Sequence, residues 1–120
     1  MEEHRLFIRY KIPGEVLIQP KDGINKTIKA NLIDLCFKGA GVYSNELIPT
    51  DTHVRILITS KAFEGHIRGE GKIRYVRILK KDQDELYRMG IEFVDVDSDL
   101  IRDILTQLQE ELSKKVEKNY

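Results

Sequence analysis

The 120-residue sequence contains one cysteine, no tryptophan and no excess of charge of either sign. With Cys36 alone, the chain can form no internal disulfide and offers no cysteine pair for a structural zinc site. Its 20 basic residues balance its 20 acidic ones, so it lacks the long-range field that draws proteins to nucleic acids or anionic membranes. An anionic ligand must therefore be held by a local cluster of positive charge.

Patterns that would indicate a membrane protein, an enzyme or a metal site are also missing. No apolar run approaches the roughly 20 residues that cross a bilayer, and the acidic start after Met1 is no signal peptide. No serine lies in a nucleophile elbow, no glycine-rich phosphate loop precedes a helix, and the three histidines lack metal-ligand spacing. We therefore expect a cytoplasmic, non-catalytic protein without membrane insertion, metal or cofactor.

Apolar residues make up 41% of the chain, which is enough for one compact core, and many of them alternate with polar residues as in strands. Turn signals separate six such runs, which predict strands at residues 9–18, 27–35, 39–43, 53–59, 63–79 and 86–94. Pro13 and Gly14 interrupt the first run, and the glycines of the fifth predict a curved or bulged strand. One alternating face of the second run carries Ile28, Ala30, Leu32 and Asp34.

The C-terminal part has a different period. Apolar residues recur there at three- and four-residue spacing, as on one stripe of a helix: Leu100, Ile101, Ile104, Leu105, Leu108, Leu112 and Val116. Asp97 or Ser98 is placed to cap the start of this helix. We predict a mainly β fold in one domain, residues 1–120: an N-terminal arm (1–9), a six-stranded antiparallel barrel (10–94), and a C-terminal α-helix (97–117) packed against the barrel or plugging it.

Two short patterns carry the candidate chemistry. Arg5 and Arg9 are four residues apart ahead of the first strand, and Asp34-x-Cys36-x-x-Gly39 ends the second. Each has an ordinary structural interpretation when taken alone. The arginines could be solvated, and Asp34 and Gly39 could belong to a plain turn in which the glycine takes a positive φ.

Taken together, the two patterns resemble the signature of the PilZ family: Arg-x-x-x-Arg, followed some twenty to thirty residues later by Asp/Asn-x-Ser-x-x-Gly. The continuation Ala40-Gly41-Val42 is similar to the family's, and so is the run from Met89 to Phe93 ahead of the helix. The resemblance covers the chain from about Arg5 to about Leu112. It implies a six-stranded PilZ-type barrel whose arm and second-strand loop bind cyclic di-GMP.

The chemistry of these residues suits that ligand, which has two phosphates and two guanines. The guanidinium groups of Arg5 and Arg9 can form bidentate bonds to phosphate or to guanine O6 and N7, and can stack on a purine. The Asp34 carboxylate can accept from guanine N1–H and N2–H. Gly39 would let the backbone turn sharply and approach the ligand. The sequence leaves open whether one ligand or an intercalated pair binds.

Cys36 departs from the family's serine, and a thiol is a weak hydrogen-bond partner. The loss of one neutral hydrogen bond costs about 0.5–1.5 kcal/mol, which weakens binding without abolishing it. We expect a cyclic di-GMP receptor that signals to an unidentified protein effector. In this scheme residues 1–8 are mobile in the free protein and become ordered when the ligand binds.

Two alternatives remain open. One is a PilZ-like adaptor that has lost the nucleotide and acts only through protein contacts, and Cys36 is the feature that favours it. The other is a barrel that binds single-stranded nucleic acid. Zero net charge and 8% aromatic residues disfavour it, because such proteins need a basic groove and stacking side chains.

Overall fold

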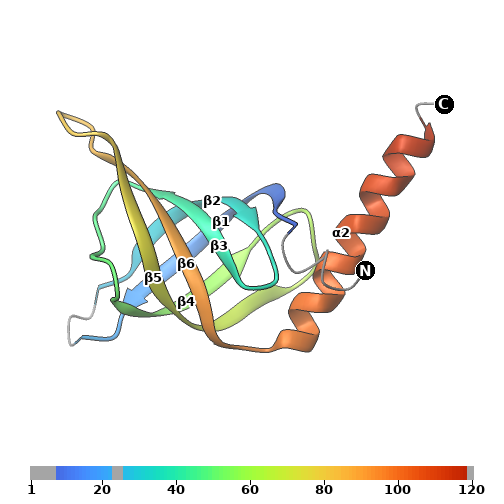
Figure 1. Cartoon of the computed structure of the whole chain (residues 1–120), viewed down its shortest axis with the longest axis horizontal. Helices are drawn as coiled ribbons and strands as arrows, with labels where there is room; N and C mark the ends of the chain where they lie inside the picture. The colour runs from blue at the N-terminus through green and yellow to red at the C-terminus, as the bar shows by residue number, and fades with distance from the viewer. Residues whose placement is uncertain (1–7, 23–25, 119–120) are drawn as a thin grey trace.

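The computed structural model describes residues 8–22 and 26–118, with side chains as far as residue 112. Its elements are β1 (Tyr10–Pro20), β2 (Ile28–Leu35), β3 (Gly39–Ser44), β4 (His53–Thr59), β5 (His66–Lys80), β6 (Leu86–Val96) and α2 (Ser98–Lys118). The six strands form one closed barrel in the order β1-β2-β3-β6-β5-β4, with every neighbouring pair antiparallel (Figure 1). This confirms the predicted barrel with a C-terminal helix.

Alternation along the strands fills the barrel with aliphatic side chains. In β4 the residues Val54, Ile56 and Ile58 are buried while their neighbours are wholly or partly exposed, as expected for a strand with one face on a core. Closure also pairs β1 with both β2 and β4, so the sheet has no open edge that could recruit another strand. The barrel is therefore a rigid frame for residues on its outer face.

Most strand ends lie within two residues of the sequence prediction, but two strands differ from it in a larger way. β1 runs through Pro13 and Gly14 without a break, because a register shift against β2 between Lys11 and Gly14 absorbs the irregularity. β5 begins at His66, not at Phe63. Phe63 is a buried apolar residue in the turn that precedes β5, and for that reason the sequence prediction included it in the strand.

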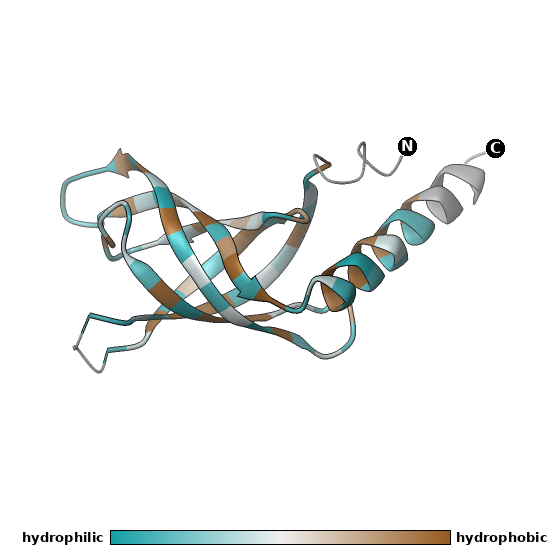
Figure 2. Ribbon diagram, turned by 60° about the horizontal axis from the view of Figure 1, so that its bottom comes forward, coloured by the Kyte–Doolittle hydropathy of each residue, from teal (hydrophilic) through white to brown (hydrophobic). Residues whose placement is uncertain are grey.

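The helix α2 is capped and packed as the sequence suggests. The cap is Asp97, whose Oδ1 accepts hydrogen bonds from the backbone N–H groups of Asp99 (3.0 Å) and Leu100 (3.2 Å). The first turns bury an apolar stripe: Ile101, Ile104, Leu105 and Leu108. Beyond them α2 extends past the end of the barrel (Figure 2), and Leu112 is 58% exposed. The helix thus packs against the barrel end with its N-terminal half.

The helix is also tied to the loop that follows β2. The guanidinium of Arg102 lies over the ring of Phe37, 5.7 Å from its centroid, which is within range of a cation–π contact.

Over residues 8–22 and 26–118, no helix is long and apolar enough to cross a bilayer.

Candidate functional site

Asp34 is the centre of the candidate site, and the structure places it on the outer face of the barrel. Asp34 pairs with Gly41 of β3, while Leu32 pairs with Val42, so β2 carries one extra residue between the two pairs. Directly paired residues share a face, and Gly41 and Val42 face opposite ways. The predicted common face of Leu32 and Asp34 is therefore wrong. The register shift reverses the face at Asp34, which a simple alternation cannot anticipate.

Although it faces outward, Asp34 is only 3% exposed and has several donors. Its Oδ1 accepts from the backbone N–H of Gly41 at 3.0 Å and from Nη1 of Arg9 at 3.1 Å. Its Oδ2 lies 3.7 Å from Nη2 of Arg88. A charged carboxylate is tolerated at such a buried position because cations and a backbone dipole compensate it.

Two glycines make this arrangement possible for reasons of space. A side chain at Gly41 would occupy the place of the Asp34 carboxylate, and one at Gly39 would overlap the carbonyl oxygen of Ile91 on β6. Gly39 does not have a positive φ, so the ordinary turn interpretation is wrong for this residue. Position 39 needs a glycine because the backbones of β3 and β6 approach each other too closely there for a side chain.

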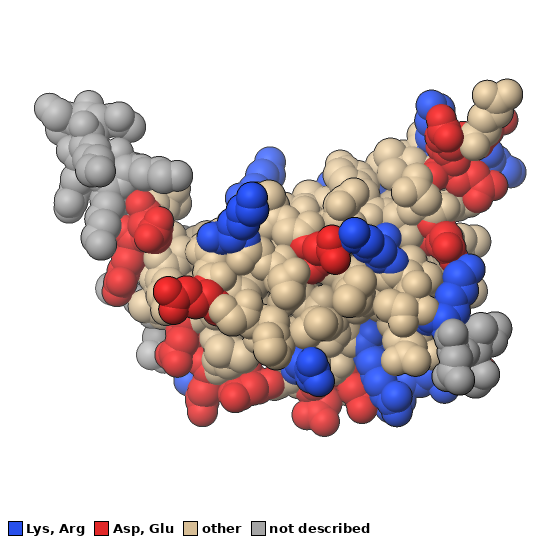
Figure 3. Space-filling model, turned by 180° about the vertical axis from the view of Figure 1, so that it is seen from behind, with Lys and Arg blue, Asp and Glu red and all other residues tan. Residues whose placement is uncertain are grey.

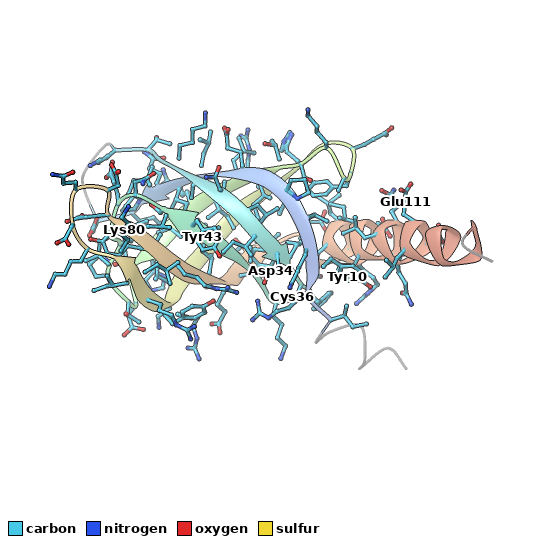
Figure 4. The ribbon with its side chains drawn as sticks, turned by 90° about the horizontal axis from the view of Figure 1, so that it is seen from above. Tyr10, Asp34, Cys36, Tyr43, Lys80 and Glu111 are labelled. Carbon is cyan, nitrogen blue, oxygen red and sulfur yellow. The ribbon has the colours of Figure 1, made fainter. Side chains whose placement is uncertain are left out.

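Two backbone hydrogen bonds close the loop from Cys36 to Gly39 and join it to the barrel. The N–H of Cys36 donates to the carbonyl of Gly39 at 2.9 Å, and the N–H of Phe93 on β6 donates to the carbonyl of Lys38 at 2.8 Å. Cys36 is a free thiol, 7% exposed. Asp34 and Cys36 lie together near the end of the barrel from which α2 leaves (Figure 4).

A surface pocket of about 220 Å³ opens beside this loop. It brings Arg9, Cys36, Lys38, Gly39 and Ala40 together with residues of β5 and β6: Arg74, Tyr75, Gly90, Ile91 and Glu92. Its lining carries three cations and one carboxylate, a net charge of +2, on a chain whose total charge is zero. This is the local cluster of positive charge that an anionic ligand requires. Ligand cavities are usually 300 Å³ or more, so a dinucleotide would lie partly outside it.

The structure therefore joins four of the five predicted site residues. Arg9, Cys36 and Gly39 line the pocket, and Asp34 lies next to it through its ion pair with Arg9. The fifth, Arg5, lies outside the described residues, as does most of the arm that carries it. Arg9 is solvated, at 54% exposure, and in addition pairs with Asp34, which the ordinary interpretation of this residue did not include.

Three site residues were missed by the sequence reasoning: Arg74, Tyr75 and Arg88. A register shift between Ile73 and Tyr75 makes Arg74 the extra residue of β5, and bulges of this kind re-aim side chains. The ring of Tyr75 lies over Gly90, where any side chain at position 90 would collide with it. The signal in the sequence was Gly90 itself, but its partner on β5 depends on the strand register.

Arg88 lies between Tyr75 and Asp34. Its Nε donates to the Tyr75 hydroxyl over a long contact of 3.5 Å, and its Nη2 faces Asp34. The hydrogen bond to Tyr75, together with the charge of Asp34, raises the pKa of Arg88 above its usual value. The guanidinium is therefore always charged at physiological pH.

Comparison with known proteins agrees with this geometry. The model of the PilZ domain matches residues 3–110, so the chain belongs to the PilZ domain family. Members of this family are non-catalytic receptor domains and generally bind cyclic di-GMP. The expected absence of enzymatic activity is thereby confirmed.

Solved structures share the fold at low sequence identity. The chain is similar to YcgR of Escherichia coli in complex with c-di-GMP, with a TM-score of 0.73, 20% identity, and coverage of 94% of this chain and 49% of that one. It is similar to the Bacillus subtilis inhibitor of motility MotI/DgrA, with a TM-score of 0.68, 19% identity, and coverage of 90% and 51%. For the separate PilZ domain of YcgR with c-di-GMP, the TM-score is 0.61 and the sequence identity 16%. The match covers 92% of this chain and 95% of that one.

The chain spans about half the length of MotI and of the longer YcgR chain. Identities of 20% or less show a common fold only. The sequence matches none of the curated proteins with which it was compared.

Proposed function

We propose that this chain is a cyclic di-GMP receptor domain whose ligand binds at the pocket beside Asp34. The observation that supports this most directly is the joining of Arg9 and the Asp34-x-Cys36-x-x-Gly39 loop at one cationic pocket. The two sequence patterns are 25 residues apart from Arg9 to Asp34 and meet only in the fold. Their meeting agrees with a shared ligand.

Each side chain has a role that its chemistry suits. Arg9 and Arg74 offer guanidinium groups to the phosphates, and Arg5 of the arm adds a third. Asp34 accepts from the N1–H and N2–H of one guanine. Gly39 keeps the loop against β6, and Cys36 borders the ligand with a weaker hydrogen-bond partner than a hydroxyl.

The signal would pass to a protein effector through the N-terminal arm. Arg9 is the last residue of the predicted arm, directly precedes β1, and contacts Asp34. A ligand that engages Arg5 and Arg9 together would restrict the residues between them and change the surface offered to a partner. Backbone ¹⁵N relaxation with and without cyclic di-GMP tests this relay. Rigid order parameters for residues 2–8 in the free protein would contradict it and make the domain a preformed receptor.

A second candidate is an adaptor of the same fold that does not bind the nucleotide. Two observations favour it: the Asp34 carboxylate already has Gly41, Arg9 and Arg88 as partners, and Cys36 replaces the family's serine. A ligand would have to compete with these contacts.

Isothermal titration with cyclic di-GMP distinguishes the two candidates, with GTP and a linear dinucleotide as controls. The receptor should bind the cyclic ligand with a dissociation constant at or below about 10 μM and the controls at least about tenfold more weakly. Binding should also weaken as salt rises, because phosphate contacts are screened. Absence of binding at about 100 μM protein would favour the adaptor.

A further inference from the structure

The strand register lines up one unusual row of residues across the outer face of four strands. Asp34 on β2 pairs with Gly41 on β3, Gly41 pairs with Gly90 on β6, and Gly90 pairs with Tyr75 on β5. Two adjacent glycines therefore separate the carboxylate from the phenol ring. We call this row the glycine trough.

Arg88 reaches along the glycine trough from the neighbouring position on β6. One end of its guanidinium contacts the Tyr75 hydroxyl, and the other faces Oδ2 of Asp34. A side chain at Gly41 or Gly90 would collide with Asp34 or Tyr75, so the trough must stay free of other side chains. The position of Arg88 is thus set by its place on β6 and by its contacts with Tyr75 and Asp34, the two ends of the row.

Asp34 consequently has two cationic partners of different character. Arg9 directly precedes β1, is 54% exposed and lines the pocket. Its Nη1 donates a hydrogen bond of 3.1 Å to Oδ1 of Asp34. Arg88 is 31% exposed, lies outside the pocket lining and is more distant, at 3.7 Å from Oδ2. The partner nearer to the ligand is the one that can be drawn away.

Removing Arg9 from Asp34 would strongly disfavour ligand binding if the carboxylate were left alone. A buried charge that loses its counter-ion keeps the desolvation penalty without the compensating attraction. Arg88 can compensate the charge of Asp34 when Arg9 leaves. Its Nη2 lies only 3.7 Å from Oδ2, and its Nε already donates to the Tyr75 hydroxyl, which positions the guanidinium. Oδ1 then becomes available to a guanine N–H while Gly41 keeps its bond.

We propose that Asp34 exchanges counter-ions on ligand binding, with Arg9 moving to the ligand phosphate and Arg88, positioned by Tyr75, taking over the carboxylate. This inference rests on the proposed function, since it describes how the same site accepts cyclic di-GMP. Arg88 is a positioning residue in this scheme and need not touch the ligand.

Titration calorimetry with cyclic di-GMP on the Arg88→Gln variant tests the exchange, and Arg77→Gln is the matched control. Arg77 is exposed and pairs directly with Arg88 across β5 and β6, so both variants remove one positive charge from the same place. We expect R88Q to lose about tenfold or more in affinity, as for one charge-assisted contact, and R77Q less than about threefold. Thermal unfolding without ligand verifies that both variants fold.

A double-mutant cycle separates the exchange from a simple packing role. In the Asp34→Asn background no buried charge needs a counter-ion, so adding R88Q should cost less than about threefold. Ligand addition should also slow the exchange of the Arg88 Nε proton with water, as followed by NMR.

Each outcome has one meaning. R88Q binding as tightly as R77Q would overturn the exchange while leaving the receptor function intact, and so would an equal loss from R88Q in the D34N background. Wild-type protein that binds no cyclic di-GMP would overturn the proposed function and the exchange together. We expect a large loss of cyclic di-GMP affinity for R88Q in the wild-type background. The loss should be small for R77Q, and small for R88Q when it is added to D34N.

Discussion

Two of the hollows lined by the described residues invite comparison, and the larger of these two is not the candidate site. A groove of about 450 Å³ crosses β1, β4 and β5 and is lined by Leu17, Gln19, Thr27, Arg55, Ile56, Leu57, Arg68, Gly69, Glu70 and Asp95. The pocket beside Asp34 is about half that volume. The groove has two arginines against two carboxylates, whereas the pocket lining has a net charge of +2. Selection by volume alone would therefore favour the groove over the candidate site.

The strand pairings beneath the two hollows differ in part. Under the groove, the β1–β4 and β4–β5 pairings are regular over their described residues and Arg55 is directly opposite Glu70, while β5 and β6 shift register between Glu70 and Gly71. Glu70 also accepts from Nζ of Lys21 at 2.7 Å, and these cations lower its pKa, with the Lys21 hydrogen bond the largest cause. At the site, by contrast, register shifts precede Asp34 and Tyr75. Arg74 at the β5 bulge nevertheless pairs with Glu92, at 3.3 Å from Nε to Oε2, so the charge of each hollow follows from the residues that line it and not from the regularity of pairing alone.

The face seen in Figure 3 resembles the groove more than the pocket in its mixture of charges. Lys and Arg are interspersed with Asp and Glu over the face seen in Figure 3, without a large area of one sign. A mixed surface without net charge does not steer anions. The excess positive charge of the pocket is therefore a local property, and substitutions in the two hollows should have unequal effects.

The largest effect should come from Asp34→Ala. The change leaves Arg9, Arg88 and the Gly41 N–H without their acceptor, so we expect about 2–3 kcal/mol of lost stability and no measurable binding of cyclic di-GMP. Urea unfolding and calorimetry measure the two effects. Glu70→Ala in the groove is the control and should bind like the wild type. Equal stability of D34A and wild type would mean that the buried ion pairs contribute nothing net.

Arg9→Ala should lower cyclic di-GMP affinity by about tenfold or more, because one charge-assisted contact to the ligand is lost. Its melting temperature should change little, since the side chain is 54% exposed and Arg88 remains near Asp34. Arg55→Ala removes the same group from the groove and should leave affinity unchanged. If both variants bind equally well, the distinction between pocket and groove fails for the ligand.

Cys36→Ser should tighten binding modestly, by about two- to tenfold, because a hydroxyl is a better hydrogen-bond partner at the pocket wall. Cys36→Ala keeps a small side chain without that partner and should show no gain. Titration calorimetry on both variants gives the answer. A serine variant that binds no better than wild type would mean that position 36 serves packing alone.

The smallest effect should come from Glu70→Gln, on the exposed Lys21–Glu70 pair. The pKa of Glu70 is lowered in the folded state, so its contribution to stability is present above its unfolded value and is lost as pH falls through the lowered one. Wild type and E70Q should therefore differ slightly at pH 7 and less at an acidic pH below the lowered pKa of Glu70. Urea unfolding at the two pH values measures this, and a difference that grows on acidification would reverse the assigned sign.

Much of the fold could be predicted from the residues in order. Alternation in segments such as His53–Thr59 predicts strands because one face must meet a core, and the three- and four-residue spacing after Asp97 predicts a helix for the same reason. The patterns around Arg9 and Asp34 indicated the candidate site because together they resemble the PilZ signature, and the chemistry of their side chains suits the ligand which that resemblance implies. The division at residues 1–9 and the role of Arg5 stay predictions.

The tertiary structure alone decided which face Asp34 occupies and which side chains surround it. One extra residue in β2 reverses the face at Asp34, and one in β5 sets Tyr75 opposite Gly90. Neither shift can be located in the sequence, because it depends on how each strand pairs with a distant neighbour. Arg88 becomes a partner of Asp34 only through pairing across β3. Local periodicity specifies strands and helices, whereas the site arises from the register between them.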